Sequence, residues 1–222
     1  MTRGAAIVGV GGLGAPAATA LARVGAALTL FDFDEVELSN LPRQPLYGLA
    51  DLGRAKAIAA AERLRACHPA SRITPANVRV DEASAASLLA GHDVILDGSD
   101  NLATKALLNE VALALSIPLV HAGAIGLEGQ LTTILPHQTA CLRCLFVELP
   151  APDDLPTCQQ AGILGPVVGA VGLAAAREAL AVLEGRRPRL AGRLAILSGQ
   201  SLAWRAIDLR PNPRCPSCRA AR

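Results

Sequence analysis

Two pairs of cysteines in the second half of the chain have the spacing of a metal site. Each pair encloses two residues, in the segments CLRC (141–144) and CPSC (215–218). Four thiolates are the usual tetrahedral ligand set of structural zinc, and they leave no position open for catalysis. Redox-active pairs and inert buried cysteines are the alternatives. The sequence therefore favours a structural zinc ion bound by Cys141, Cys144, Cys215 and Cys218.

A glycine-rich segment near the start of the chain has the pattern of a phosphate-binding turn. The motif GVGGLG supplies Gly9, Gly11, Gly12 and Gly14. Glycines let the backbone approach a phosphate closely, and the N-terminus of the following helix favours negative charge. Asp32 lies about 20 residues further on, at the end of a predicted strand, where a carboxylate can bind ribose hydroxyls. The pattern indicates a nucleotide but does not choose NAD or ATP, and a purely structural turn is the alternative.

Three charged residues lie on predicted loops after strands, where ligands bind in parallel sheets. Arg43 and Lys56 have the charge to neutralise phosphates, and each alone is also typical of a surface residue. Asp100, just after the predicted strand 94–97, can hold Mg²⁺ with one carboxylate, or can cap the helix that follows.

Two further cysteines lie outside the paired motifs. Cys158 is in a polar segment, PTCQQ, where a reactive thiol and an incidental one are both reasonable interpretations. Cys67 ends an apolar helical pattern, and we expect it to be packed in the interior.

The elements that must position these residues alternate between strand and helix along the chain. We predict strands at 5–10, 28–31, 73–80, 94–97, 118–121, 130–135, 194–198 and 203–209, the last of them at a sheet edge. We predict helices at 13–24, 54–67, 83–89, 101–115 and 173–183. This order predicts an α/β, Rossmann-like, mostly parallel sheet with helices on both faces, extended by antiparallel strands and a four-cysteine zinc site. The glycine-rich segment 162–172 either lets the chain pass close to a bound peptide or packs a helix closely on the sheet.

Composition narrows the class of protein. A chain of 222 residues fits one large α/β domain. Aromatic residues make up 2% of the chain, too few for a nucleic-acid reader that stacks bases, and the net charge is only +2. We see no signal peptide and no window with the apolar length of a membrane span, so we expect a cytoplasmic protein with reduced cysteines and no membrane or nucleic-acid partner.

The motifs together resemble the ThiF/MoeB/HesA group, the prokaryotic relatives of ubiquitin-activating enzymes. The resemblance runs from about Ala5 to Cys218. The segments that carry it, in chain order, are GVGGLGAP, FDFDEVELSNLPRQ, DLGRAK, DGSDN, GQLTTILP, CLRC, CQQAGILGPVVGAVG and CPSC.

The resemblance implies a role for each motif. It assigns ATP to Gly12 and Asp32, phosphate contacts to Ser39, Asn40, Arg43 and Lys56, and Mg²⁺ to Asp100 with Asn101 beside it. It implies that the paired CxxC motifs bind zinc, and that Cys158 can take part in sulfur or acyl transfer. It also implies an N-terminal segment of some twenty residues that supplies an arginine to the neighbour's ATP in a homodimer, whereas here only Arg3 precedes the glycine loop.

The implied activity is ATP-dependent adenylation of the C-terminal Gly-Gly carboxylate of a small ubiquitin-like sulfur-carrier protein, for thiamine or molybdopterin biosynthesis. A cysteine desulfurase or rhodanese-type protein would donate the sulfur. We expect one adenylation domain over 1–222, with a nucleotide-binding half at 1–135 and a zinc-knuckle, crossover-loop and carrier-binding half at 136–222. A non-catalytic carrier-binding scaffold and an NAD-dependent oxidoreductase are the competing hypotheses, and the second leaves Arg43, Lys56, Asp100 and four zinc cysteines unexplained.

Overall fold

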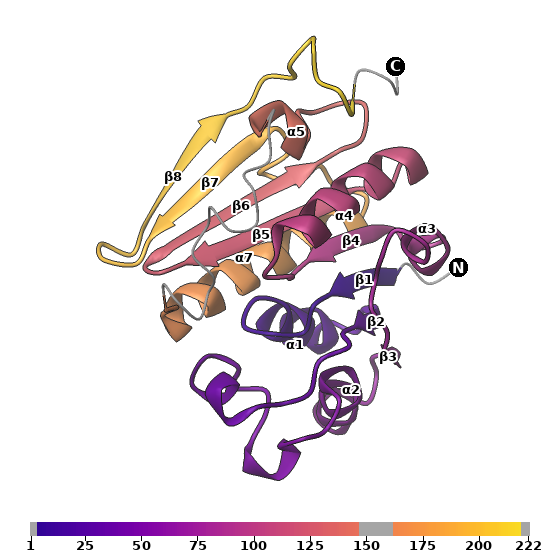
Figure 1. The fold of residues 1–222 in the computed structure, drawn as a ribbon, viewed down its shortest axis with the longest axis vertical. Helices are drawn as coiled ribbons and strands as arrows, with labels where there is room; N and C mark the ends of the chain where they lie inside the picture. The colour runs from indigo at the N-terminus through magenta and orange to yellow at the C-terminus, as the bar shows by residue number, and fades with distance from the viewer. Residues whose placement is uncertain (1–3, 147–161, 219–222) are drawn as a thin grey trace.

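A computed structural model describes residues 4–146 and 162–218 of the chain. Eight strands form one mixed sheet in the order β3-β2-β1-β4-β5-β6-β7-β8 (Figure 1). The strands are β1 (Gly4–Val8), β2 (Ala27–Phe31), β3 (Ile73–Ala76), β4 (Val94–Asp97), β5 (Leu119–Ile125), β6 (Glu128–Ile134), β7 (Arg193–Ser198) and β8 (Ala203–Asp208). The helices are α1 (Gly14–Arg23), α2 (Lys56–Cys67), α3 (Ala85–Leu89), α4 (Leu102–Leu115), α5 (Leu142–Leu145) and α7 (Gly165–Leu183), with the 3₁₀ helices η1 (Leu38–Arg43) and η2 (Leu49–Asp51).

The sheet is parallel on one side and antiparallel on the other. β3, β2, β1, β4 and β5 pair in parallel, and β5, β6, β7 and β8 form successive antiparallel pairs. β1 and β4 are almost wholly aliphatic and buried, as expected of interior parallel strands that are covered on both faces. The predicted α/β fold, a mostly parallel sheet extended by antiparallel strands, is confirmed.

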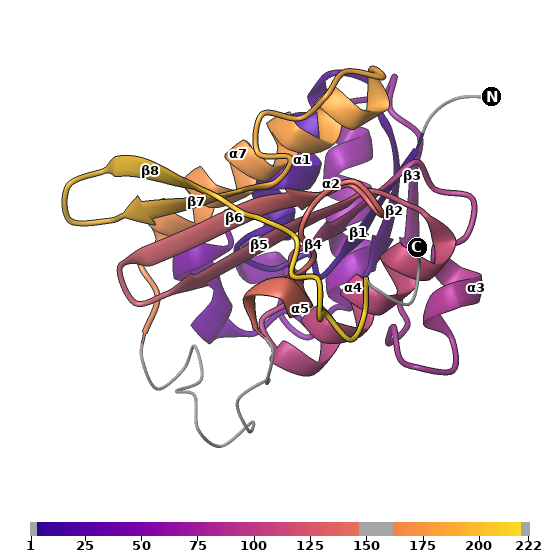
Figure 2. The same ribbon diagram turned by 90° about the horizontal axis from the view of Figure 1, so that it is seen from above.

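Helices cover both faces of the sheet (Figure 2). α1, α2 and α7 pack on one face, where Leu21, Leu64 and Val171 belong to a shared apolar cluster. α3, α4 and α5 pack on the other face, and a second cluster includes Leu108 and the buried cysteines. The carboxyl ends of the parallel strands therefore lie between the two helical layers. The predicted ligand-binding loops follow these strand ends.

Helix α7 begins earlier than the sequence predicts. The prediction that the helix starts at Leu173 is wrong, because most of the glycine-rich segment is its first half. A Cβ atom on Gly172 would lie 2.4 Å from the carbonyl oxygen of Leu13, so this glycine lets α7 pack directly against the start of α1. This contact agrees with the interpretation of close helix packing, and the passage of a bound peptide along the segment stays a prediction.

The prediction that no segment has the apolar length of a membrane span is also wrong. α7 has 19 residues and a mean hydropathy of 1.6, which meets that criterion by length and composition. In this fold 56% of its apolar window is buried, and it packs on β5, β6 and α1. Its hydropathy is thus accounted for by its position in the core, since a helix that is apolar on most sides is typical of a core helix.

Strand ends differ from prediction where pairing continues or stops. β5 extends to Ile125 because the hairpin with β6 pairs Ile125 with Glu128, whereas the predicted strand stops at His121. β3 ends at Ala76 because its one described neighbour, β2, ends opposite it, whereas the predicted strand continues to residue 80. β8 is exposed along its whole length, in agreement with the predicted sheet edge.

Candidate nucleotide and metal sites

The glycine loop connects β1 to α1 and leaves no room for a side chain at Gly9 or Gly14. Gly9 has a φ of +86°, which favours glycine, and a Cβ atom on Gly14 would lie 1.8 Å from the carbonyl oxygen of Gly9. A Cβ atom on Gly98, in the loop after β4, would lie 2.7 Å from the same oxygen. The loops after β1 and β4 therefore touch backbone to backbone at the carboxyl edge of the sheet.

Asp32, just after β2, fixes the glycine loop from the other side. Its Oδ2 accepts a hydrogen bond of 2.7 Å from the Val10 N–H, and its Oδ1 accepts one of 2.9 Å from the Asp34 N–H. Burial raises the pKa of Asp32, and these backbone N–H groups and Lys56 oppose that rise. Each oxygen keeps a lone pair for a further donor such as a ribose hydroxyl.

The polar segment predicted to contact phosphates forms η1 and covers the glycine loop. Ser39, Asn40 and Arg43 all lie on η1, and the Arg43 Nη1 donates to the Ser39 carbonyl at 2.8 Å. A Cβ atom on Gly12 would lie 3.4 Å from the Arg43 carbonyl oxygen and 3.1 Å from Val168 of α7. Thus η1 and α7 both pack against the glycine loop.

Lys56 begins α2 and reaches the same edge of the sheet. Its side chain is 8% exposed, and its Nζ lies 3.0 Å from Oδ2 of Asp34, whose own side chain is 51% exposed. The ammonium is thus held at the end of β2 by a carboxylate that solvent can reach.

Asp100 and Asn101 follow β4 and have different local roles. The Asn101 Oδ1 accepts a hydrogen bond of 2.8 Å from the Thr104 N–H and caps α4. The alternative that Asp100 caps this helix is therefore wrong. Asp100 is exposed, and none of the described residues forms a hydrogen bond or ion pair with its carboxylate. An exposed, unpaired carboxylate beside the glycine loop fits a Mg²⁺ ligand for a bound nucleotide.

Sequence reasoning missed a buried charged network behind these loops. Asp97, Lys105 and His121 come from β4, α4 and β5 and are all buried. The Lys105 Nζ lies 3.1 Å from the Asp97 Oδ2, and the His121 Nδ1 donates to the same oxygen at 2.8 Å. Burial alone would raise the pKa of Asp97, but Lys105 and His121 lower it to about 2. Burial lowers the pKa of His121, which favours the neutral ring.

Two signals for missed residues were available in the sequence. Lys56 and Lys105 are its only lysines, so a second lysine inside an apolar helix was unusual. Tyr47 is the only tyrosine. Its hydroxyl donates a hydrogen bond of 2.7 Å to the Val10 carbonyl and connects the segment after η1 to the glycine loop.

Gln44 also packs against the glycine loop. Its amide contacts Gly11, and its Oε1 is buried without a hydrogen-bond partner among the described residues.

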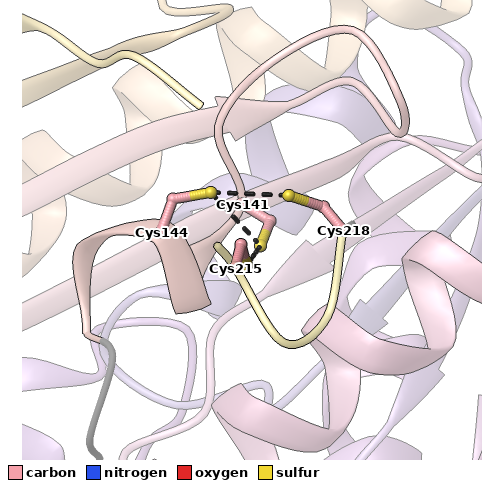
Figure 3. A group of neighbouring side chains, drawn as sticks. All are labelled: Cys141, Cys144, Cys215 and Cys218. Carbon is pink, nitrogen blue, oxygen red and sulfur yellow. Dashed lines mark hydrogen bonds between the residues drawn. The ribbon is translucent and has the colours of Figure 1, made fainter. Parts of the chain in front are cut away.

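The four paired cysteines meet on the α4 face of the sheet (Figure 3). All four sulfurs lie within 4.8 Å of one another, and neighbouring pairs are 3.5, 3.6 and 3.9 Å apart. Zn–S bonds of ~2.3 Å in a tetrahedron place sulfurs about 3.8 Å apart, so the cluster fits that ion. The prediction that Cys141, Cys144, Cys215 and Cys218 come together is confirmed.

The two remaining cysteines differ in what the structure says of them. Cys67 is exposed at the end of α2, so the expectation that it is packed in the interior is wrong. Its neighbours on the last turn of α2, Arg65 and Ala66, are exposed as well. Cys158 lies outside the described residues, and so does Arg3.

Comparisons with known proteins agree with this architecture. The ThiF family model matches residues 3–217. The SAMP-activating enzyme E1 of Haloferax volcanii is 42% identical over 213 residues, which span 96% of this chain and 78% of the relative. The molybdopterin-synthase adenylyltransferase of Escherichia coli is 40% identical over 215 residues, spanning 96% of this chain and 85% of the relative. The crystal structure of E. coli MccB with succinimide superposes with a TM-score of 0.85 at 17% identity, covering 97% of this chain and 66% of that one, a likeness of fold alone. The chain belongs to the ThiF family.

Proposed function

We propose that this protein uses ATP to adenylate the C-terminal carboxylate of a small ubiquitin-like sulfur-carrier protein. The observation that carries the proposal is the backbone contact between the glycine loop and the loop of Asp100. Around this contact lie the carboxylate of Asp32, the covering segment of Arg43 and the ammonium of Lys56. Such a set supplies a turn for phosphates, an acceptor for ribose, two cations and a metal ligand. Relatives at about 40% identity are named adenylyltransferases, which supports the same chemistry here.

The reaction requires little covalent work from the protein. A carboxylate oxygen of the carrier attacks the α-phosphorus of ATP and forms a new O–P bond. The bond between the α-phosphorus and the oxygen that bridges it to the β-phosphorus breaks, and pyrophosphate leaves. The protein must align the two reactants and offset the charge on the phosphoryl oxygens. Arg43 and Lys56 supply positive charge, and Asp100 would hold the Mg²⁺ that neutralises the leaving pyrophosphate.

The finer assignments belong to the same proposal. The carrier ends in Gly-Gly and is of the type used in thiamine or molybdopterin biosynthesis. Its acyl-adenylate then passes to a sulfur donor of the cysteine desulfurase or rhodanese type, with Cys158 as a candidate thiol. Zn²⁺ on the four cysteines is structural, since every ligand position is a cysteine. The protein acts as a cytoplasmic homodimer.

Exchange of pyrophosphate into ATP tests the proposal. We expect purified protein with Mg²⁺ to catalyse exchange only when a Gly-Gly-ended carrier is present, and Asp100→Ala to abolish it. Asp93→Ala is the matched control, because Asp93 is also an exposed carboxylate but lies at the amino end of β4, the opposite edge of the sheet from Asp100. Folded, zinc-loaded protein that shows no exchange with any carrier would favour the non-catalytic scaffold instead.

A further inference from the structure

The buried network of Asp97, Lys105 and His121 joins the loop of Asp100 to the core of the protein. Asp97 is fully buried, and its Oδ1 accepts hydrogen bonds from the Ser99 N–H at 3.0 Å and the Ser99 hydroxyl at 2.6 Å. The loop is therefore fixed at its start by a carboxylate. At its end, Asn101 caps α4, the helix that carries Lys105. Asp100 lies between these two fixed points.

The described hydrogen-bond partners of Lys105 are all inside the protein. Its ammonium lies 3.3 Å from the Asp97 Oδ1, 3.1 Å from the Asp97 Oδ2 and 2.7 Å from the Ala122 carbonyl oxygen. The two carboxylate oxygens belong to one group, so these contacts hold the ammonium between the Asp97 carboxylate and the Ala122 carbonyl. Lys105 therefore acts on the loop of Asp100 through Asp97.

The cost of burying this network indicates a role in positioning. Apolar side chains of similar volume often give equal or greater stability than a buried ion pair. In this chain arginine fills every cationic position except Lys56 and Lys105. A lysine ammonium is more compact than a guanidinium, and it fits between one carboxylate and one backbone carbonyl here. The network thus orders a specific loop at the carboxyl edge of the sheet.

We propose that Lys105 is a positioning residue for Mg²⁺-dependent nucleotide binding: through Asp97 and Ser99 it holds the loop of Asp100, the proposed Mg²⁺ ligand. This inference rests on the nucleotide site of the proposed function but not on adenylation itself. Outer residues that orient a metal ligand commonly change metal affinity about 10- to 100-fold when they are removed.

Nucleotide binding, followed by thermal unfolding, tests the positioning role without any carrier. We expect ATP to raise the melting temperature of the wild type more with Mg²⁺ than with EDTA. Lys105→Met should need about tenfold more Mg²⁺ for the same increment, while the increment in EDTA stays unchanged. Ser99→Ala leaves the ion pair intact and removes one loop contact, so it should show a smaller shift in the same direction. In an Asp100→Ala background, Lys105→Met should cause no additional loss.

Each outcome decides the inference. A lower melting temperature for Lys105→Met with a normal Mg²⁺ requirement would mean that the network only supports the fold, and would overturn the proposal. A wild type without a Mg²⁺-dependent increment would also overturn it. If Lys105→Met does not fold, a normal Mg²⁺ requirement in Ser99→Ala has the same consequence. Mg²⁺-dependent binding that Lys105→Met impairs, in a protein without pyrophosphate exchange, would refute the proposed function and leave the positioning role standing.

Discussion

The ammonium of Lys56 lies 3.0 Å from the Oδ2 of Asp34, at the point where β2 ends beside the glycine loop. The lysine side chain is almost fully buried, whereas the aspartate is half exposed, so the pair has one fixed and one accessible member. An incoming triphosphate can therefore meet a cation that is already in place. Preorganised charge of this kind does not have to be reorganised during the reaction, which is why it lowers the barrier.

Removing the Lys56 cation should reduce catalysis more than it reduces stability. We expect Lys56→Met to lower kcat/KM for ATP in pyrophosphate exchange about 100-fold, as loss of one transition-state donor typically does. Asp34→Asn, which keeps the lysine, should lose much less. Steady-state exchange assays at varied ATP concentration give both values. A wild-type rate in Lys56→Met would remove this residue from the phosphate site.

Two glycines of α7 should respond to alanine in opposite directions. Gly172→Ala places a Cβ atom 2.4 Å from the Leu13 carbonyl oxygen, and we expect it to lower the free energy of unfolding by about 1–3 kcal/mol. No neighbouring atom of the described residues lies within 4 Å of a Cβ atom on Gly169, so Gly169→Ala should raise that free energy by about 0.5–1 kcal/mol. Urea denaturation measures both. Equal effects at the two positions would contradict the close packing of α7 on α1.

Loss of one paired cysteine should release the metal. We expect Cys144→Ser to lose stoichiometric zinc, and a loss of about 3 kcal/mol would lower the melting temperature by about 10 °C. Cys67→Ser is the matched control, because Cys67 is exposed and lies outside the cluster. Metal analysis and thermal unfolding of the two variants check this. Wild-type protein purified without metal but with full stability would show that the cluster does not need an ion.

Protonation of the Asp97 carboxylate should make the protein less stable in acid. Its folded pKa of about 2 is below the ordinary value of 3.8, so its stabilising effect is complete above that ordinary value and is lost as pH falls toward 2. We expect this group to contribute about 2 kcal/mol to the loss between pH 4 and pH 2. Urea denaturation of the wild type and of Asp97→Asn across this pH range isolates the contribution of Asp97 to the free energy of unfolding. The variant should be less stable at neutral pH, since Lys105 is left unpaired, but its stability should change less with pH.

The sequence was sufficient for the order of strands and helices and for the meeting of the four paired cysteines, but not for the other contacts between distant segments. The glycine motif and the aliphatic runs depend on local backbone needs, so β1, the glycine turn and β2 form where they are predicted, although strand ends differ. Asp97, Lys105 and His121 come from three elements, and only the parallel register that pairs Asp97 with His121 brings them together. One sequence carries no direct signal for that register.

The prediction for the glycine-rich start of α7 was wrong for a related reason. The low helix propensity of glycine argues against helix over 165–172, yet packing decides the outcome there because α7 must approach α1 closely. Tyr47 illustrates the same limit, since its hydroxyl reaches a carbonyl 37 positions away in the chain. The roles assigned to Arg43, Lys56, Asp32 and Asp100 stay predictions, as does the division of the chain into halves at residue 135.

The central claim is that the carrier's carboxylate takes the adenylyl group of ATP. The most direct measurement compares ATP labelled in the α-phosphate with ATP labelled in the γ-phosphate, in the presence of Mg²⁺ and a Gly-Gly-ended carrier. The account predicts an acid-stable adenylated carrier that contains label only from the α-phosphate, with none formed by Asp100→Ala. Label transferred from the γ-phosphate, or a carrier left unlabelled by folded and zinc-loaded protein, would contradict it.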